Sequence, residues 1–376
     1  MDKKLKVLAV FGTRPDAVKM APVVQELRKF PDKVDLSVAV SGQHREMLDQ
    51  VLEVFEIKPD FDLQIMQAKQ SLSSITSRCL EGLEDVLSQV CPDLVVAQGD
   101  TTTTFVASLA AFYHKIPFGH VEAGLRTDNK YNPFPEEINR RLTSELTDIH
   151  FAPTERARRN LLASGVPDER VVVTGNTVID ALLAVTGRPF VFEDEWIEVA
   201  TRDGSRLILV TAHRRESWGD PLRSVCRAIA EIVRRHPDVK VVFPVHKNPI
   251  VREIVFPELE SIDRVRLMEP PEYIPFVHLM KQSYLILTDS GGVQEEAPSL
   301  GKPVLVLRQT TERPEAVEAG SAKLIGTKKE DIIAEVESLL ASRTQYDRMA
   351  EVKNPYGDGT AARRIRQAIF AYFKIE

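Results

Sequence analysis

Short apolar runs recur along the chain, and they lack a polar face. The runs cover residues 7–11, 36–40, 94–97, 171–173, 207–210, 239–245, 285–287 and 304–307. Runs rich in Val, Ile and Leu without alternation are typical of strands that are buried on both faces, as in a parallel sheet. We therefore predict a strand at each run.

Amphipathic segments lie between these runs. Apolar side chains recur at helical spacing in two of the clearest segments, at 47, 48, 51, 52 and 55 and at 222, 225, 229, 232 and 233. Strands that alternate with helices over the whole length indicate an α/β fold, doubly wound around parallel sheets.

The length of 376 residues indicates two or three domains, since a domain has roughly 100–200 residues. The weakest pattern lies near 185–205, around Gly187 and Pro189 and the acidic residues 193–195. We expect the linker there. The tail from Thr360 to Phe373 is a basic amphipathic helix that could pack on either domain.

Composition narrows the class of protein. The net charge is 49 − 55 = −6, which argues against a general nucleic-acid or anionic-membrane binder. Cys79, Cys91 and Cys226 form no CxxC pair and fit reduced thiols, hence a cytoplasmic protein. The eight histidines show no HxH or HExxH spacing, so we expect no metal site. No apolar stretch approaches the ~18 residues that span a bilayer.

Unusual polar clusters follow the predicted strands. They lie at residues 12–16, 98–104, 122–126, 211–216 and 288–296. In parallel sheets, ligands bind outside the carboxyl ends of the strands. If the two sheets face each other, all five clusters would converge on one interdomain cleft.

The segment 288–296 is the most informative of these clusters. A strand runs into Ser290-Gly291-Gly292 and then into a helix, where free N–H groups and the helix dipole suit a phosphate. Ser290 could also cap the helix. The alternative is an ordinary strand–turn–helix. Neither a P-loop nor a GxGxxG pattern is present. Glu295 and Glu296 point to different faces, so one could accept bonds from ribose hydroxyls, unless both are a solvated pair.

Two carboxylates at strand ends are candidates for chemistry. Asp100 precedes four threonines and could be a helix N-cap instead. Glu122 lies in an apolar strand end flanked by Gly119 and Gly124, so we expect it to be paired or functional.

A helix start and a histidine add further candidates. The helix after Pro135 could hold two i,i+4 ion pairs, Glu136–Arg140 and Glu137–Arg141. His213 beside Arg214 and Arg215 could contact an anion, carry a proton or be structural.

These segments together resemble the bacterial UDP-N-acetylglucosamine 2-epimerases, chiefly the non-hydrolysing type. The matching stretches run in family order over nearly the whole chain, at 10–15, 99–104, 120–127, 135–140, 174–180, 211–216 and 288–298. The resemblance implies a GT-B fold with two Rossmann-like domains that face an interdomain cleft. The N-terminal domain would cover residues 1–190, and the C-terminal helix 359–376 would pack on it. The C-terminal domain would cover residues 200–355.

The resemblance also implies the reaction and its residues. The enzyme would interconvert UDP-GlcNAc and UDP-ManNAc by elimination of UDP to 2-acetamidoglucal and re-addition, as a homodimer without cofactor, and would supply ManNAc units for surface polysaccharide. The implied catalytic residues are Asp100, Glu122, Glu136 and His213. The implied substrate-binding residues are Arg14, Lys19, Arg140, Phe276, Ser290, Gly291, Gly292, Glu296 and Arg313.

Some family members bind UDP-GlcNAc at a second, activating site. Gln43, Glu46, Lys69 and Gln70 correspond to that region, although Glu46 and Lys69 depart from the Gln and Arg of the clearest allosteric members. The alternatives to the main interpretation are a hydrolysing epimerase that releases UDP and ManNAc, a GT-B glycosyltransferase and a non-catalytic nucleotide-sugar sensor.

Overall fold

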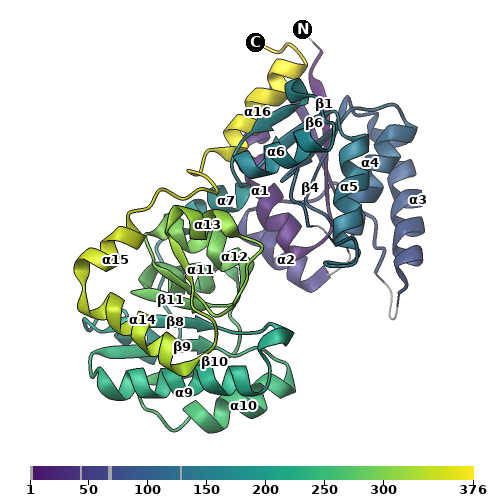
Figure 1. Ribbon diagram of the computed structural model, residues 1–376. Coiled ribbons are helices and arrows are strands. Elements are labelled where there is room, and N and C mark those ends of the chain that lie inside the picture. The colour runs from purple at the N-terminus through teal and green to yellow at the C-terminus, as the bar shows by residue number, and fades with distance from the viewer. Residues whose placement is uncertain (1–2, 43–44, 67–69, 128) are drawn as a thin grey trace. The chain divides into compact units, whose positions relative to one another are not determined.

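The structure is a computed structural model that describes residues 3–42, 45–66, 70–127 and 129–376, without the side chains of residues 45–47 (Figure 1). The chain divides into two compact units. The first unit comprises Met1–Ala181 and Gly357–Glu376, and the second comprises Leu182–Tyr356.

The first unit is built on a parallel sheet of seven strands in the order β3-β2-β1-β4-β5-β6-β7. The strands are β1 (Leu5–Phe11), β2 (Val34–Val40), β3 (Phe61–Asp62), β4 (Leu94–Gln98), β5 (Phe118–Val121), β6 (Ile149–Ala152) and β7 (Val171–Val173). Strand β4 is buried at every position, which explains its apolar sequence from Leu94 to Ala97.

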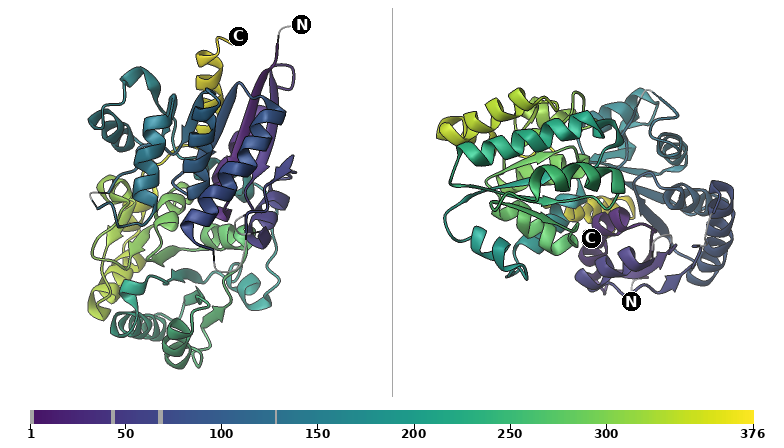
Figure 2. Two further views of the ribbon diagram at one scale, coloured as in Figure 1. Left: turned by 90° about the vertical axis from the view of Figure 1, so that its right-hand side faces the viewer. Right: turned by 90° about the horizontal axis from the view of Figure 1, so that it is seen from below.

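Helices cover both faces of this sheet (Figure 2). They are α1 (Arg14–Arg28), α2 (Arg45–Val54), α3 (Leu72–Val90), α4 (Thr102–Tyr113), α5 (Glu136–Leu146), α6 (Glu155–Ala163), α7 (Thr177–Thr186) and α16 (Ala361–Tyr372). The chain winds from β1 toward β3 in one direction and from β4 toward β7 in the other. Because parallel crossovers are right-handed, the two directions place helices on opposite faces. The reversal lies between β1 and β4, where ligands bind in doubly wound sheets.

The second unit repeats this plan with six parallel strands in the order β10-β9-β8-β11-β12-β13. The strands are β8 (Arg206–Thr211), β9 (Val239–Pro244), β10 (Val265–Met268), β11 (Leu285–Thr288), β12 (Val304–Val306) and β13 (Ala322–Leu324). The helices are α8 (Glu195–Ala200), α9 (Asp220–Arg235), α10 (Pro249–Leu259), α11 (Tyr273–Gln282), α12 (Gly291–Glu296), α13 (Pro314–Ala319), α14 (Lys329–Ala341) and α15 (Arg343–Ala350). Its reversal lies between β8 and β11.

The predicted α/β fold with parallel sheets is confirmed, and each predicted apolar run forms a strand. The strands β3, β6, β10 and β13 were not predicted, and β5 was expected only from the polar cluster at 122–126 that follows it. Strand β3 has only two residues. The other three are interrupted by His150, Arg266 and Lys323, so their apolar runs are too short to stand out.

The C-terminal helix α16 packs on the first unit, where it contacts α1. The rings of Phe30 and Phe370 lie edge to face at 5.6 Å between centroids, and the Arg366 guanidinium lies 4.3 Å from the centre of the Phe30 ring. At the start of α16, the Asp180 carboxylate accepts bonds from the Ala361 and Ala362 amides at 3.1 and 2.9 Å. A side chain of α7 therefore caps a helix whose first residue lies 181 positions later in the sequence.

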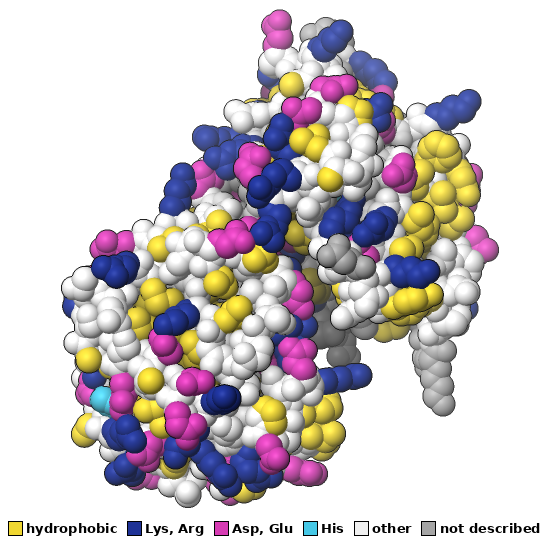
Figure 3. Space-filling model, in the orientation of Figure 1, with side chains coloured by type: hydrophobic (Ala, Val, Ile, Leu, Met, Phe, Trp, Pro, Cys, Tyr) yellow, Lys and Arg dark blue, Asp and Glu magenta, His cyan; other side chains and the backbone are white. Residues whose placement is uncertain are grey.

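Positive and negative side chains are interspersed on the face drawn in Figure 3. In the part of the chain that the structure describes, no helix is both long and apolar enough to cross a bilayer.

We expect Asp180→Ala to loosen α16, because two amides at the helix start lose their acceptor. The loss of such a cap costs about 1–2 kcal/mol. Hydrogen exchange followed by mass spectrometry should show faster exchange of residues 361–372 in this variant. Glu81→Ala, which removes an exposed carboxylate of α3, is the control and should leave α16 unchanged. Equal protection of α16 in both variants would show that the cap does not hold the helix.

Candidate active site

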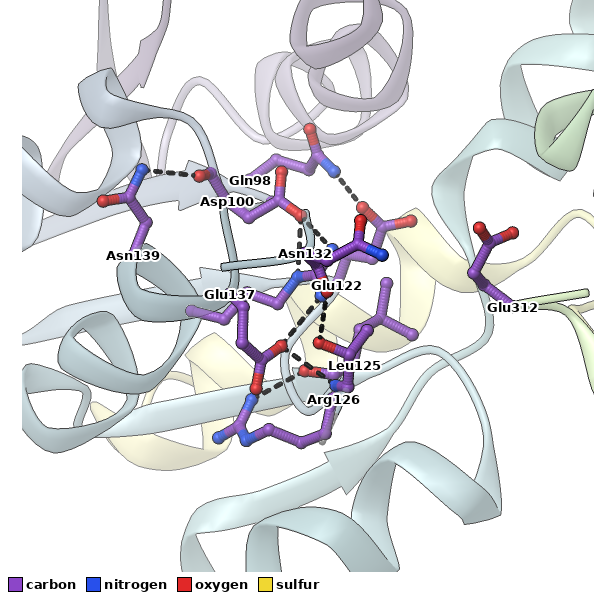
Figure 4. Close-up of polar contacts among 12 residues, drawn as sticks. Gln98, Asp100, Glu122, Leu125, Arg126, Asn132, Glu137, Asn139 and Glu312 are labelled. Atoms are coloured by element: carbon purple, nitrogen blue, oxygen red, sulfur yellow. Dashed lines mark hydrogen bonds and ion pairs between the residues drawn. The ribbon is translucent and has the colours of Figure 1, made fainter. Parts of the chain in front are cut away.

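The loop that follows β4 is fixed by its carbonyl groups. Three successive carbonyls each accept a hydrogen bond from a side chain of a different element. The pairs are Thr104 Oγ1 to Gln98 O at 2.6 Å, His120 Nε2 to Gly99 O at 2.7 Å and Asn139 Nδ2 to Asp100 O at 2.9 Å. Figure 4 shows Asn139 pointing at this loop. The backbone that carries Asp100 is therefore held by α4, β5 and α5 together.

The Asp100 carboxylate forms an ion pair with Arg140 of α5. Asp100 Oδ2 lies 2.7 Å from both Arg140 Nε and Arg140 Nη2. The N-cap alternative for Asp100 was wrong, because Thr101 is the N-cap and its hydroxyl accepts from Thr104 N. The Asp100 carboxylate therefore contacts the Arg140 guanidinium and does not cap the helix.

Helix α5 begins at Glu136 and turns Glu137 into the protein. Glu137 is fully buried and pairs with Arg141 at 2.7 Å and with Arg140 at 3.1 Å. Burial by itself would raise the pKa of Glu137, but the hydrogen bonds from Arg141 and from the Thr127 amide lower it overall. The expected Glu137–Arg141 pair is confirmed. The expected Glu136–Arg140 pair is wrong, because Arg140 turns to Asp100 and Glu137 instead.

Glu122 lies directly after β5 in a left-handed backbone conformation with φ of 65°. Its side chain is an ion pair partner of Lys19, with Oε1 at 2.5 Å from the Lys19 Nζ. The Asn176 amide donates to the same oxygen at 2.8 Å, and the Gln98 amide donates to Oε2 (Figure 4). Glu122 is therefore paired, as a carboxylate in an apolar strand end must be. Only glycine fits at the nearby position 124, because the Cβ of any other residue would lie 2.3 Å from Ala157 O.

Two buried histidines lie side by side beneath these carboxylates. His120 on β5 pairs in register with His150 on β6. Burial lowers the pKa of His120 to about 4 and that of His150 to about 3. Both rings are therefore neutral at pH 7, and the proton of His120 lies on Nε2, which donates to Gly99 O.

A further buried acid, Asp16, joins the first turn of α1 to the Asp100 loop. Its Oδ2 accepts from the Gly12 and Thr13 amides at 3.4 and 3.2 Å and from Thr101 Oγ1 at 3.3 Å. Burial raises the pKa of Asp16 to about 6, against the lowering effect of the Thr13 and Gly12 hydrogen bonds. Arg14, at the start of the same helix, is half-buried.

In the second unit, Asp289 organises the ends of β8 and β11. Its buried carboxylate accepts from the His213 and Arg214 amides at 2.7 and 2.8 Å, and His213 Nδ1 lies 2.8 Å from Oδ1. Burial would raise the pKa of Asp289, but the His213 contacts and the two amides hold it below its usual value. The His213 side chain keeps 40% of its surface exposed, so its Nε2 edge is available to a ligand.

The turn at Ser290-Gly291-Gly292 leads into α12, as predicted. Ser290 is the N-cap residue, but its side chain makes no capping bond, so the predicted cap was wrong. A Cβ at Gly291 would lie 3.9 Å from Arg214 Nη2 and from Arg313 Cγ, which places both arginines beside the turn. A Cβ at Gly292 would lie 3.5 Å from Glu296 Oε1.

The two acids of α12 face different ways, as predicted. Glu295 is buried and pairs with Arg313, whereas Glu296 is half-buried. Phe276 lies half-buried on α11.

Of the residues matched to an activating site, Gln43 and Lys69 lie outside the described residues, as does the side chain of Glu46. The Gln70 side chain donates to Ile65 O.

The structure thus assembles the predicted residues into one group in each unit. The group of the first unit contains two ion pairs, Lys19–Glu122 and Arg140–Asp100. They are connected through Gln98, whose side chain donates to Glu122 and whose backbone leads into the Asp100 loop. The group of the second unit places Gly291, Gly292, Glu296 and Arg313 around one turn, with His213 anchored through Asp289 beside Ser290. The side chains of Glu136 and Arg14 make no hydrogen bond or ion pair with the described residues.

The sequence analysis assigned no role to four residues that hold these groups together. They are Asp16, Gln98, Asn176 and Asp289. Glu137 was expected to pair with Arg141, but its second ion pair with Arg140 was not expected. Gln98, Asn176 and Asp289 each lie at or just after the carboxyl end of a strand, and this position was the available signal. Among the described residues, no cluster of three or more His, Cys, Asp and Glu side chains is arranged to hold a metal ion.

The two doubly wound units define a GT-B fold, and comparison with known proteins supports this class. A crystal structure of the glycotransferase of kitacinnamycin, 12% identical, shares the fold with a TM-score of 0.66 over all of both chains. The sequence model of the UDP-N-acetylglucosamine 2-epimerases matches residues 25–370. The chain belongs to this family.

Individual relatives are similar over their whole length. The chain is 55% identical to the UDP-N-acetylglucosamine 2-epimerase of Yersinia pestis over 370 residues, which cover 97% of this chain and 98% of the relative. It is 51% identical to the UDP-GlcNAc 2-epimerase of Neisseria meningitidis, whose crystal structure is bound to UDP-GlcNAc. That structure matches with a TM-score of 0.86, covering 98% of this chain and all of the other.

We expect Asp16 to make the free energy of unfolding depend on pH. Its pKa is raised from 3.8 to about 6 on folding, so between these values the folded state binds more protons than the unfolded state, and the contribution of Asp16 to stability falls as pH rises. The change amounts to about 3 kcal/mol at ~1.4 kcal/mol per pH unit.

Urea denaturation at several pH values tests this expectation. The free energy of unfolding of Asp16→Asn, relative to the unaltered protein, should increase from pH 4 to about pH 6 and then level off by pH 7. Asp35→Asn, which changes an exposed residue of β2, is the control. A difference between Asp16→Asn and the unaltered protein that stays constant over this range would contradict the raised pKa.

Proposed function

We propose that the protein interconverts UDP-GlcNAc and UDP-ManNAc by inverting C2 of the sugar, with no net hydrolysis. Family membership and the Neisseria meningitidis relative that binds UDP-GlcNAc support this proposal. The observation that carries it is the anchoring of two carboxylates, Asp100 and Glu122, next to the cations Arg140 and Lys19. An acid–base reaction on an uncharged sugar ring needs such fixed carboxylates.

The chemistry explains why the leaving group has to depart. The C2 proton of the sugar is not acidic, because no carbonyl lies next to that carbon. When the C1–O bond to UDP breaks, UDP takes the electron pair and positive charge develops at C1. A base then removes the C2 proton, and the C–H electron pair forms the C1=C2 bond of 2-acetamidoglucal. Addition of a proton to the other face of C2 and of UDP to C1 gives the epimer.

In the proposed reaction, the second unit holds the leaving group. The Ser290 side chain, the amides of Gly291 and Gly292 and the cations beside them would bind the diphosphate and stabilise its growing charge. The arginines beside Gly291 are Arg214 and Arg313. His213, oriented by Asp289, would contact the phosphate or protonate a leaving oxygen. Glu296 would bind the ribose hydroxyls, and Phe276 would contact the uracil ring.

The first unit would act on the sugar. Two faces of C2 have to be served, so two proton-transferring groups are needed. Asp100, Glu122 and Glu136 are the candidates, and Lys19, Arg14 and Arg140 would bind the sugar or its phosphate. Closure of the site around the bound ligand would exclude water, which would protect the glucal intermediate and prevent its hydrolysis.

The ManNAc unit of the product would serve surface polysaccharide synthesis. We also predict that the protein is a homodimer and that it is cytoplasmic.

Proton NMR of UDP-GlcNAc in D₂O tests the proposed function directly. We expect UDP-ManNAc to appear with deuterium at C2, because the C2 proton exchanges with solvent while it is held by the enzyme. A hydrolysing epimerase would instead accumulate UDP and free ManNAc. A glycosyltransferase without acceptor, or a nucleotide-sugar sensor, would leave the spectrum unchanged, and that result would refute the proposal.

The three carboxylates should each be needed for turnover. We expect Asp100→Asn, Glu122→Gln and Glu136→Gln to lower kcat by at least ~10²-fold, since each loses a proton-transferring or ion-pairing group. Glu81→Gln on the exposed face of α3 is the matched control and should keep the original rate. Initial rates from coupled assays of UDP-ManNAc formation give the comparison. Near-normal rates in all three variants would refute the assignment.

A further inference from the structure

Two neutral amides hold the carboxylate of Glu122, and the proposed reaction does not use them. Asn176 Nδ2 donates to Glu122 Oε1 at 2.8 Å, and Gln98 Nε2 donates to Oε2. Gln98, Asn176 and Glu122 are all buried, with 3%, 2% and 9% of their surfaces exposed. The donors come from the ends of β4 and β7, on either side of β5 and β6 in the sheet. Each carboxylate oxygen thus has its own amide partner.

The orientation of Asn176 is fixed by a second hydrogen bond. Its side-chain oxygen accepts from the Val178 amide at 3.1 Å, in the first turn of α7. The amide nitrogen must therefore be the atom that faces Glu122, because a flipped side chain would break both bonds. Gln98 is held through its backbone, where its carbonyl accepts from Thr104 Oγ1 at 2.6 Å. The Asn176 amide is thus fixed from both ends, whereas Gln98 is fixed at its backbone and donates from its side chain to Glu122.

We propose that Gln98 and Asn176 are positioning residues that keep Glu122 ionised and fix the direction of its lone pairs for proton transfer at C2 of the sugar. This inference rests on the proposed function. Donor hydrogen bonds stabilise the charged form of a carboxylate, and a fixed lone-pair direction shortens the search for a reactive geometry. The amides do this without adding a charge that would compete with Lys19.

Two ionisable side chains near Glu122, those of Lys19 and His120, are compatible with this role. Lys19 of α1 faces Oε1 directly. His120, two residues earlier on the same strand, interacts electrostatically with Glu122, Asp100 and Arg126. Its pKa is lowered to about 4 by burial, so its ring stays neutral from pH 5 upward. The amides of Gln98 and Asn176 do not titrate, and a carboxylate introduced in place of either one would be a new acid in the group.

The test replaces each amide by its isosteric acid. In Asn176→Asp and in Gln98→Glu, a second carboxyl lies against Glu122, and the two share a proton, as close carboxyl pairs do. We expect the acidic limb of kcat/KM against pH to move up by at least about one unit and kcat at pH 7 to fall at least ~10-fold. The KM for UDP-GlcNAc should stay within ~2-fold, because Glu122 acts in the chemical step.

Two variants without a new charge separate positioning from electrostatics. Asn176→Ala and Gln98→Met remove one donor each, so we expect a lower kcat and a larger kinetic isotope effect with UDP-GlcNAc deuterated at C2, since proton abstraction becomes slower. Gln25→Glu is the control. Gln25 lies on α1, away from Glu122, and its side-chain amide donates to Phe55 O at 3.0 Å. The acid introduced there should leave the acidic limb of kcat/KM against pH unchanged.

The outcomes distinguish the two proposals. If the unaltered protein forms no UDP-ManNAc, the proposed function fails. If it does, while the folded variants keep its pH limb and isotope effect, the positioning role fails. Calorimetric UDP binding and thermal unfolding identify misfolded variants. Should both acid variants misfold, the isotope effects of Asn176→Ala and Gln98→Met decide alone, and values equal to those of the unaltered protein overturn the proposal.

Discussion

A charged carboxylate at the end of a buried strand has to be paired, because an isolated buried charge costs several kcal/mol. Glu122 occupies such a place after β5, and its partners come from separate parts of the first unit. Lys19 reaches it from α1, Gln98 from the end of β4 and Asn176 from the segment after β7. The charge can be tolerated only if the sheet order brings these elements together. The strand order and the group of polar residues therefore depend on each other.

The second unit solves the same problem with one acid. Asp289 is fully buried after β11 and accepts from the amides of His213 and Arg214, which follow β8. These are the two strands between which the winding direction reverses. At such a reversal the loops after neighbouring strands separate, which leaves an opening for a ligand. Asp289 joins the two loops at their base, so that His213 and the glycine turn stay in place on either side.

Much of the fold could be predicted from the sequence, because both sheets are buried on both faces. Strands β1 and β4 contain the unbroken apolar runs 7–11 and 94–97, and only a two-sided layer of helices can cover them. Strands β6 and β10 escaped prediction because a His or Arg interrupts them. That polar clusters follow the strands was also visible in the sequence, and it located Asp100, Glu122 and His213 correctly at strand ends.

The partners of those residues could not be predicted in the same way. Whether Arg140 pairs with Glu136 or with Asp100 depends on the rotation of α5 about its axis, and i,i+4 spacing favours the wrong partner. Whether Ser290 caps α12 depends on a side-chain torsion. The bond from Asn176 to Glu122 spans 54 residues and exists only because β5, β6 and β7 are adjacent. Local patterns identify the polar residues of the site, whereas the sheet topology selects their partners.

The three carboxylates of the proposed reaction differ in how firmly the protein holds them. Asp100 is paired with Arg140 and Glu122 with Lys19, Gln98 and Asn176, whereas the Glu136 side chain makes no hydrogen bond or ion pair with the described residues. A base that must meet a C–H bond gains from a fixed direction, since carbon acids offer no hydrogen bond to guide it. A group that returns a proton to the opposite face can instead be oriented by the ligand itself. On this reasoning, the anchored acids suit proton abstraction from C2, and Glu136 at the start of α5 suits the contact that forms only when the sugar is bound.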